Sequence, residues 1–119
     1  AIISNSKMIQ EYYMSVMNHE QTEVVDYVIG AFQFISRKMI NEIGVYDDKI
    51  FYGPEDIDYC LRAKKHGYKV VYYPKVRLYH FYQRITKKLF SVITLKHFLG
   101  LVHFFWKHRY INKPSLKRS

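Results

Sequence analysis

Three carboxylates lie close together near the middle of the chain, at Glu55, Asp56 and Asp58, just after Pro54. A carboxylate at the mouth of a helix can act as the general base that takes a proton from an incoming hydroxyl group. The same acids also have a structural explanation, because acidic side chains stabilise the start of a helix. Asp58 lies four residues before Arg62, the spacing of an ordinary helical ion pair. Taken alone, the structural roles are the commoner ones, so both explanations stay open.

These acids need a helix to hold them, and the flanking residues predict one. Pro54 suits the first helical position, basic residues fill the last turns, and Gly67 can end the helix. A shorter helix is predicted between Ser36, which can cap its start, and Gly44, which can end it in the left-handed conformation. The sequence therefore predicts helices over about 54–67 and 36–44.

Short strands and one long helix complete the predicted elements. Residues 26–36 are predicted to be strand-like, because β-branched and aromatic side chains recur in Val24-Val25 and Tyr27-Val28-Ile29, and Gly30 permits a close backbone approach. Residues 69–73 read as a strand that ends at Pro74, and residues 76–80 alternate weakly like a second short strand. From about 87 to 110 the apolar spacing is helical, and Gly100 predicts a bend or a break there.

The composition fits one small domain. The chain has 119 residues, of which 49% are hydrophobic and 18% aromatic, so it can form a core. Its single cysteine, Cys60, excludes a disulfide scaffold and a cysteine-based zinc site. The sequence has no glycine-rich phosphate loop, no nucleophile elbow and no zinc-protease motif. No local pattern by itself therefore names a reaction.

Charge is divided unevenly along the chain. Residues 1–58 carry all ten acids and four bases, whereas residues 59–119 carry fifteen bases and no acid. The basic half predicts an anionic partner, which could be nucleic acid, a lipid surface or a phosphorylated ligand. In the last helix, bases flank an apolar face with Phe98, Phe104, Phe105 and Trp106, a pattern typical of helices in a membrane interface. The alternative is that this face packs on the domain core.

The most specific motifs follow one another in order along residues 24–82. They are Val28-Ile29-Gly30-Ala31-Phe32 through Arg37-Lys38, Glu42-Ile43-Gly44-Val45-Tyr46-Asp47, Phe51, Glu55-Asp56-Ile57-Asp58-Tyr59-Cys60-Leu61-Arg62, Gly67-Tyr68, Tyr73-Pro74 and His80. In this order and spacing they resemble the C-terminal half of family 2 glycosyltransferases, above all the rhamnosyltransferase-like bacterial members.

The resemblance implies an α/β fold, a truncated GT-A fold with a mixed sheet, packed helices and an amphipathic C-terminal helix. The implied reaction moves a sugar from a nucleotide-sugar donor to a hydroxyl acceptor, with inversion at the anomeric carbon. The acceptor would belong to a cell-surface polysaccharide or a lipid-linked glycan. Residues 1–86 would be the acceptor-side part of the catalytic domain, and residues 87–119 the basic amphipathic helix and tail.

The resemblance also assigns roles to single residues. Asp56 matches the general base of the family, and Glu55 matches its supporting carboxylate. Gly30 and Ala31 match the stretch that lines the donor-sugar and acceptor side of the pocket. His80 matches a histidine that, in several members, ligates the divalent metal (Mg²⁺ or Mn²⁺) holding the donor diphosphate.

Two aromatic residues just before the acids, Phe51 and Tyr52, can supply a stacking platform for a sugar.

The nucleotide-binding half of the family and its Asp-x-Asp metal motif are missing from the sequence, and Asp47-Asp48 lies at a turn motif and does not replace them. We therefore expect a fragment that is inactive alone, binds metal weakly and self-associates through apolar surface and strand edges.

We expect the full-length enzyme in the cytoplasm, at the inner face of the cell membrane. Two alternative functions come from the basic half of the chain. One is a nucleic-acid-binding module, although the acids cluster where the family motif predicts them and no nucleic-acid motif is present. The other is a membrane-surface interaction module without catalysis.

Overall fold

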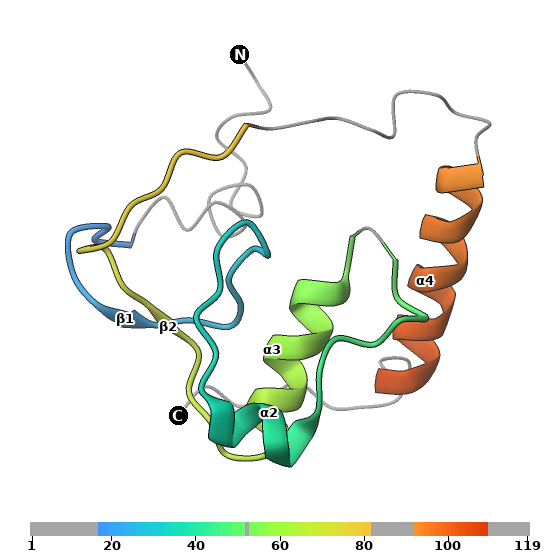
Figure 1. Cartoon of the computed structure of the whole chain (residues 1–119), viewed down its shortest axis with the longest axis horizontal. Coiled ribbons are helices and arrows are strands. Elements are labelled where there is room, and N and C mark those ends of the chain that lie inside the picture. Colours follow the sequence, from blue (N-terminus) through green and yellow to red (C-terminus); the bar gives the residue numbers. More distant parts are fainter. Residues whose placement is uncertain (1–16, 52, 82–91, 110–119) are drawn as a thin grey trace.

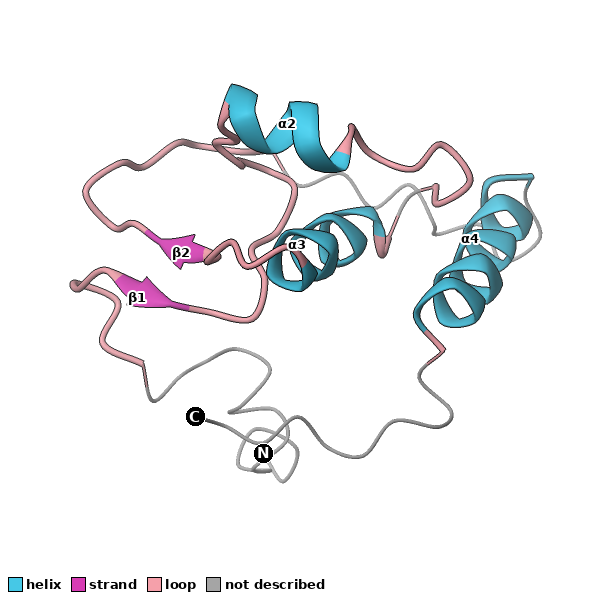
Figure 2. Cartoon of the chain, turned by 90° about the horizontal axis from the view of Figure 1, so that it is seen from below, coloured by secondary structure: helices cyan, strands magenta, loops and turns pink. Residues whose placement is uncertain are grey.

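The computed structural model describes residues 17–51, 53–81 and 92–109. In chain order the elements are strand β1 (Glu23–Val24), helix α2 (Arg37–Ile43), helix α3 (Glu55–Lys65), strand β2 (Val71–Tyr72) and helix α4 (Val92–His108). Helix α3 lies in the middle, with the two strands on one side and α4 on the other (Figures 1 and 2). The described chain is therefore an α/β arrangement centred on α3. The predicted boundary between residues 86 and 87 lies outside the described residues.

The sheet consists of one antiparallel pair, in which Glu23 faces Tyr72 and Val24 faces Val71. The pairing extends by one further bond, from the Val25 N–H to the carbonyl of residue 70, at 3.0 Å. Val25 is buried with Cys60 of α3 and Val70, so the small core joins the strand pair to the central helix.

Part of the predicted strand structure is wrong. Within the described residues there is an antiparallel pair and not a mixed sheet, and neither 26–36 nor 76–80 forms a strand. The loop after Val25 makes its hydrogen bonds to side chains instead of to a neighbouring strand. The Gly30 N–H donates to Asp56, and the Gln33 side-chain amide donates to the Val28 carbonyl at 2.7 Å. Residues 75–80 are exposed, with no described strand beside them to pair with.

Both short-range helix predictions are confirmed. The Ser36 hydroxyl caps α2 by accepting the Met39 N–H at 3.2 Å, and Gly44 ends the helix with a φ of 79°. Helix α3 carries its acids in the first turn and its bases in the last, as the dipole favours. Pro54 is the residue before the first helical turn and not its first member.

The predicted break at Gly100 is wrong, because α4 runs without interruption through this residue. Gly100 is buried against the backbone of Phe51, where a Cβ atom would lie 3.0 Å from the amide nitrogen and 3.3 Å from the carbonyl oxygen. One turn earlier, the ring of His97 covers Gly53 so closely that a Cβ on Gly53 would lie 2.5 Å from it. The glycines therefore bring α4 close to the loop that leads into α3.

We expect Gly100→Ala to lower the free energy of unfolding by about 1 kcal/mol, although alanine is the better helix former. The added methyl group would meet the Phe51 backbone, which cannot move aside like a side chain. Urea denaturation measures the change, with Leu95→Ala on the exposed face of α4 as a nearly neutral control. A more stable Gly100→Ala protein would show that helix propensity outweighs the close contact.

Candidate active site

Asp56 lies in the first turn of α3, and two backbone amides hold its carboxylate. Oδ2 accepts the Gly30 N–H at 2.9 Å, and Oδ1 accepts the N–H of Ile57 at 2.7 Å. Burial raises the pKa of Asp56, the two amide bonds oppose the rise, and the charge of Glu55 adds to it. Asp56 is thus a half-buried, oriented carboxylate with a greater proton affinity than an ordinary aspartate.

The structure brings together two residues that the sequence predicted in one site, Asp56 and Gly30. They are 26 positions apart in the sequence, and the loop that carries Gly30 is fixed from its other side. Gln33 donates to the Val28 carbonyl and accepts a short hydrogen bond from the Tyr46 hydroxyl. Ala31 follows in the same loop and is partly buried.

Glu55 has a separate local contact. Its Oε2 accepts the N–H of Gly53, so the carboxylate closes the turn between the loop and α3. No hydrogen bond joins Glu55 to Asp56 among the described residues; Glu55 acts on its neighbour through charge. This arrangement leaves Asp56 as the carboxylate that the fold orients from two directions.

Asp58 is the most buried side chain of the described residues, with 0% of its surface exposed, and it is fully paired. Oδ2 accepts the Arg62 Nε–H at 2.9 Å, as the four-residue spacing predicted. Oδ1 lies 2.9 Å from Lys107 Nζ and 2.7 Å from His108 Nε2, both at the end of α4. His108 Nδ1 lies 2.9 Å from Lys65 Nζ. One carboxylate therefore connects α3 with α4, a role that the sequence interpretation missed.

The ionisation states in this network are set by both burial and pairing. Burial would raise the pKa of Asp58, but hydrogen bonds from Lys107, His108 and Arg62 lower it below its ordinary value. Burial lowers the pKa of His108, against the opposing hydrogen bond to Asp58. A neutral His108 fits both contacts, because the Lys65 ammonium can only donate to Nδ1 and the Nε2–H then donates to Asp58.

Arg62 extends the same network to α2. Its Nη1 and Nη2 groups donate to the carbonyls of Ile43 and Val45, each at 2.8 Å. The guanidinium also lies 4.7 Å from the ring centroid of Tyr59, whose hydroxyl donates to the Gly44 carbonyl. The end of α2 is thereby tied to α3.

Asp47 forms the second contact between the loop and α4. Its Oδ2 lies 2.6 Å from Lys107 Nζ and 3.2 Å from His103 Nε2. The hydrogen bond from Lys107 holds the pKa of Asp47 well below its ordinary value, although burial opposes it. Lys107 therefore bridges two acids of the first half of the chain, Asp47 and Asp58.

This network predicts that acid weakens the attachment of α4 in two stages. The pKa of His108 is lower in the folded protein than in the unfolded chain, where it is about 6.5. As the pH drops below about 6.5, the unfolded chain binds a proton that the folded protein does not, so the free energy of unfolding falls. The folded pKa values of Asp47 and Asp58 lie below 3.8, so their contribution is full above that pH and is lost as they are protonated below it. The pKa of Asp56 is raised in the folded protein, so its contribution to the free energy of unfolding has the opposite sign. It is greatest at low pH and decreases as the pH rises through that pKa.

The measurement is the urea midpoint of unfolding as a function of pH, monitored by the fluorescence of Trp106 in α4 and by circular dichroism. His108→Gln should remove the stage near neutral pH and keep the stage at low pH. A midpoint that stays constant from neutral pH to pH 4 would contradict the neutral assignment of His108.

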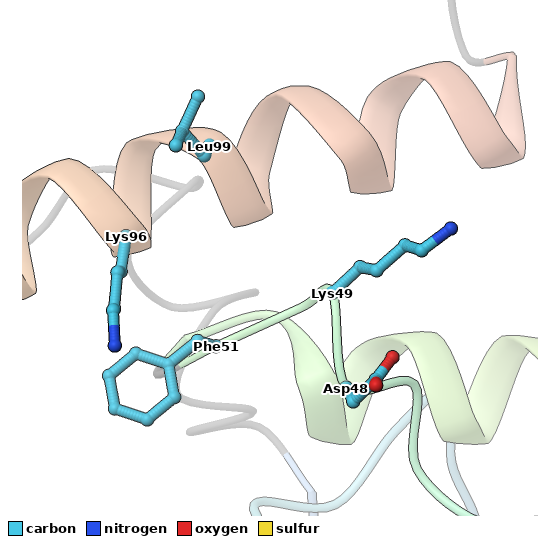
Figure 3. Close-up of a pocket in the computed structure, with 5 residues that line it drawn as sticks. All are labelled: Asp48, Lys49, Phe51, Lys96 and Leu99. Atoms are coloured by element: carbon cyan, nitrogen blue, oxygen red, sulfur yellow. The ribbon is translucent and has the colours of Figure 1, made fainter.

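The remaining predicted site residues lie apart from Asp56 or outside the description. Phe51 is 46% exposed and lines a pocket of about 260 Å³ with Asp48, Lys49, Lys96 and Leu99 (Figure 3). The Lys96 side chain points toward the Phe51 ring, with Nζ 5.7 Å from its centroid, whereas Lys49 points elsewhere. The charged groups of this pocket do not converge on one point, and Tyr52 is outside the described residues.

His80, the predicted metal ligand, is exposed in the segment after β2. Across residues 17–51, 53–81 and 92–109 there is no group of three or more His, Cys, Asp or Glu side chains that could hold a metal ion. The described residues therefore do not form a metal site around His80.

Comparison with known proteins places the chain in a family. Residues 4–96 match the family described as "Glycosyltransferase like family 2". The chain belongs to this family, which confirms the resemblance at that level.

A curated protein is also similar to the chain. It is named "Inactive polypeptide N-acetylgalactosaminyltransferase-like protein 5", from Macaca fascicularis, and is 34% identical over 96 residues. The match covers 74% of this chain and 21% of that protein, so the chain spans about a fifth of its relative's length. No solved structure matches the chain.

Proposed function

We propose that this chain is the acceptor-side part of the catalytic domain of an inverting glycosyltransferase with a GT-A fold, and that Asp56 is its general base. The observation that carries the proposal is the carboxylate of Asp56, held at the start of α3 by the amides of Gly30 and Ile57. Membership of family 2 supports sugar transfer as the reaction class.

The chemistry follows from the position of that carboxylate. The acceptor hydroxyl gives its proton to a carboxylate oxygen of Asp56, and its oxygen forms a bond to the anomeric carbon of the donor sugar. The bond from that carbon to the nucleoside diphosphate breaks, and the diphosphate leaves with the electron pair. The Gly30 and Ile57 N–H groups each use one lone pair of the Asp56 carboxylate, which offers about four acceptor positions, so a lone pair remains for the proton. The raised pKa of Asp56 makes it a better base than an ordinary aspartate.

The donor would be a nucleotide sugar, and the acceptor a polysaccharide or lipid-linked glycan, as in the bacterial rhamnosyltransferase-like members that the motifs resemble. The rest of the full-length protein would bind the nucleotide and any divalent metal. We place the enzyme in the cytoplasm, at the inner face of the membrane.

A transfer assay on the full-length protein tests this proposal. It measures nucleoside diphosphate released from a panel of nucleotide sugars, with and without hydroxyl acceptors, and NMR reads the anomeric configuration of the product. We expect acceptor-dependent release and an inverted anomeric centre. A product with retained configuration would contradict the role of Asp56, since retention is not explained by one general base. The 119-residue chain alone should show no turnover.

A further inference from the structure

Helix α4 has two faces of different character. Gly100, Phe104 and His108 are buried against the rest of the chain. The opposite face carries six apolar side chains that are each at least half exposed, here called the outer face: Leu95, Phe98, Leu99, Val102, Phe105 and Trp106. They recur at spacings of three and four residues, and Leu99 among them also lines the pocket beside Phe51 (Figure 3). The apolar face predicted from the sequence is therefore divided, because Phe104 packs on the domain whereas Phe98, Phe105 and Trp106 are exposed.

The sequence around the outer face is basic. No residue from 59 to 119 is acidic, and Lys87, Lys88, Lys113, Lys117 and Arg118 flank α4 along the sequence. On the helix itself, Lys96 is exposed but points toward the Phe51 ring, and Arg109 lies just beyond the end of α4. Lys107 is engaged with Asp47 and Asp58, so it belongs to the buried side.

We infer that the outer face of α4 docks on an anionic lipid bilayer. An apolar stripe with aromatic residues inserts between headgroups, and the surrounding bases meet negatively charged lipid. No helix within the described residues is long and apolar enough to cross a membrane, so the contact is one of a helix lying on the surface. The exposure of the outer face and the basic sequence around it support this docking independently of the proposed sugar transfer.

The same observations disfavour nucleic acid as the partner. Binding to a phosphate backbone needs bases that project from the binding surface, whereas no charged side chain lies within the outer face between Leu95 and Trp106. The aromatic side chains there alternate with aliphatic ones, which suits acyl chains better than stacked bases.

Trp106 is the single tryptophan of the chain and is 75% exposed on the outer face, so its fluorescence reports directly on docking. The 119-residue chain is titrated with vesicles of phosphatidylcholine alone and of phosphatidylcholine mixed with phosphatidylglycerol. We expect a blue shift of the emission with the mixed vesicles, co-sedimentation of the protein, and affinity at least about tenfold lower in high salt or without the anionic lipid.

A matched pair of double variants tests the face itself. Phe98→Ser with Val102→Ser removes an aromatic and a branched side chain from the outer face and keeps Trp106. Phe34→Ser with Val76→Ser makes the same changes at exposed positions on other segments. We expect the first pair to lose about tenfold or more in vesicle affinity and the second to bind like the parent. All four positions are exposed, and circular dichroism confirms that helix content is unchanged.

Three results would overturn the inference. The first is Trp106 emission that anionic vesicles leave unchanged at low salt. The second is a blue shift that grows with protein concentration without lipid, which would assign the face to a second copy of the chain. The third is vesicle binding that single-stranded RNA abolishes and that Phe98→Ser with Val102→Ser leaves intact, which would assign it to basic charge alone.

Discussion

Replacing Asp56 by asparagine should lower the turnover of the proposed full-length transferase by about two to four orders of magnitude, because an amide cannot accept the acceptor proton. The substitution keeps the size of the side chain, but the amide oxygen can accept only one of the two backbone N–H groups, from Gly30 or from Ile57. The free energy of unfolding should therefore fall by about 1 kcal/mol, while donor binding stays close to that of the parent. Parent activity should also fall as the pH drops through the raised pKa of Asp56, since only the ionised carboxylate is a base. Steady-state kinetics as a function of pH measure both effects.

Glu55→Gln is the matched control for this prediction. A glutamine oxygen can still accept the Gly53 N–H, so the loop before α3 keeps its hydrogen bond and activity should fall much less. If Asp56→Asn kept nearly full turnover while Glu55→Gln lost it, the base would be Glu55.

The largest loss of stability is expected for Asp58→Ala, at about 3–5 kcal/mol. The substitution leaves Lys107 and Arg62 without their buried carboxylate and removes the partner of the His108 ring. A domain of this size is stable by about 5–15 kcal/mol, so much of its stability depends on this side chain. Urea unfolding followed by Trp106 fluorescence and circular dichroism measures it.

Asp48→Ala is the control for Asp58→Ala, because Asp48 is exposed. It should change the free energy of unfolding by less than about 0.5 kcal/mol. A cost below about 1 kcal/mol for Asp58→Ala would mean that water replaces the lost carboxylate and that the network contributes little.

Local signals predicted the two short helices well. Ser36 and Gly44 delimit α2, and α3 has acids in its first turn and bases in its last, as the helix dipole favours. Residues close in the sequence were therefore enough to predict these helices. The strands were overestimated, because the loop after Val25 bonds to side chains of α3: Gly30 donates to Asp56 and Gln33 to Cys60, which lie 26 and 27 positions away. Spacing rules cannot reveal such partners.

The glycine in α4 shows the same limit. Its low helix propensity predicted a bend, but Gly100 is needed for the approach of α4 to the backbone of Phe51. Whether a glycine weakens a helix or lets it pack closely depends on a neighbour that the local sequence does not name.

The charge pattern was interpreted only in part. A basic second half predicted an external anionic partner, yet several of its bases pair with acids of the first half. Arg62 pairs with Asp58, Lys64 with Asp26, and Lys107 with Asp47 and Asp58. The signal was present in the opposite charges of the two halves, but the pairs lie up to 60 residues apart and only the fold selects them.

Helix α4 cannot slide along the domain. Gly100 fits against Phe51 and the His97 ring fits over Gly53, so a shift by one turn, about 5.4 Å, would bring a bulky side chain to the place of Gly100. Helix α4 therefore either stays bound to the loop before α3 along its whole length or detaches from it as a whole. Its close contacts with Phe51 and Gly53, and the pairing of its last turn with Asp58, connect the position of α4 to the first turn of α3, which also carries Asp56.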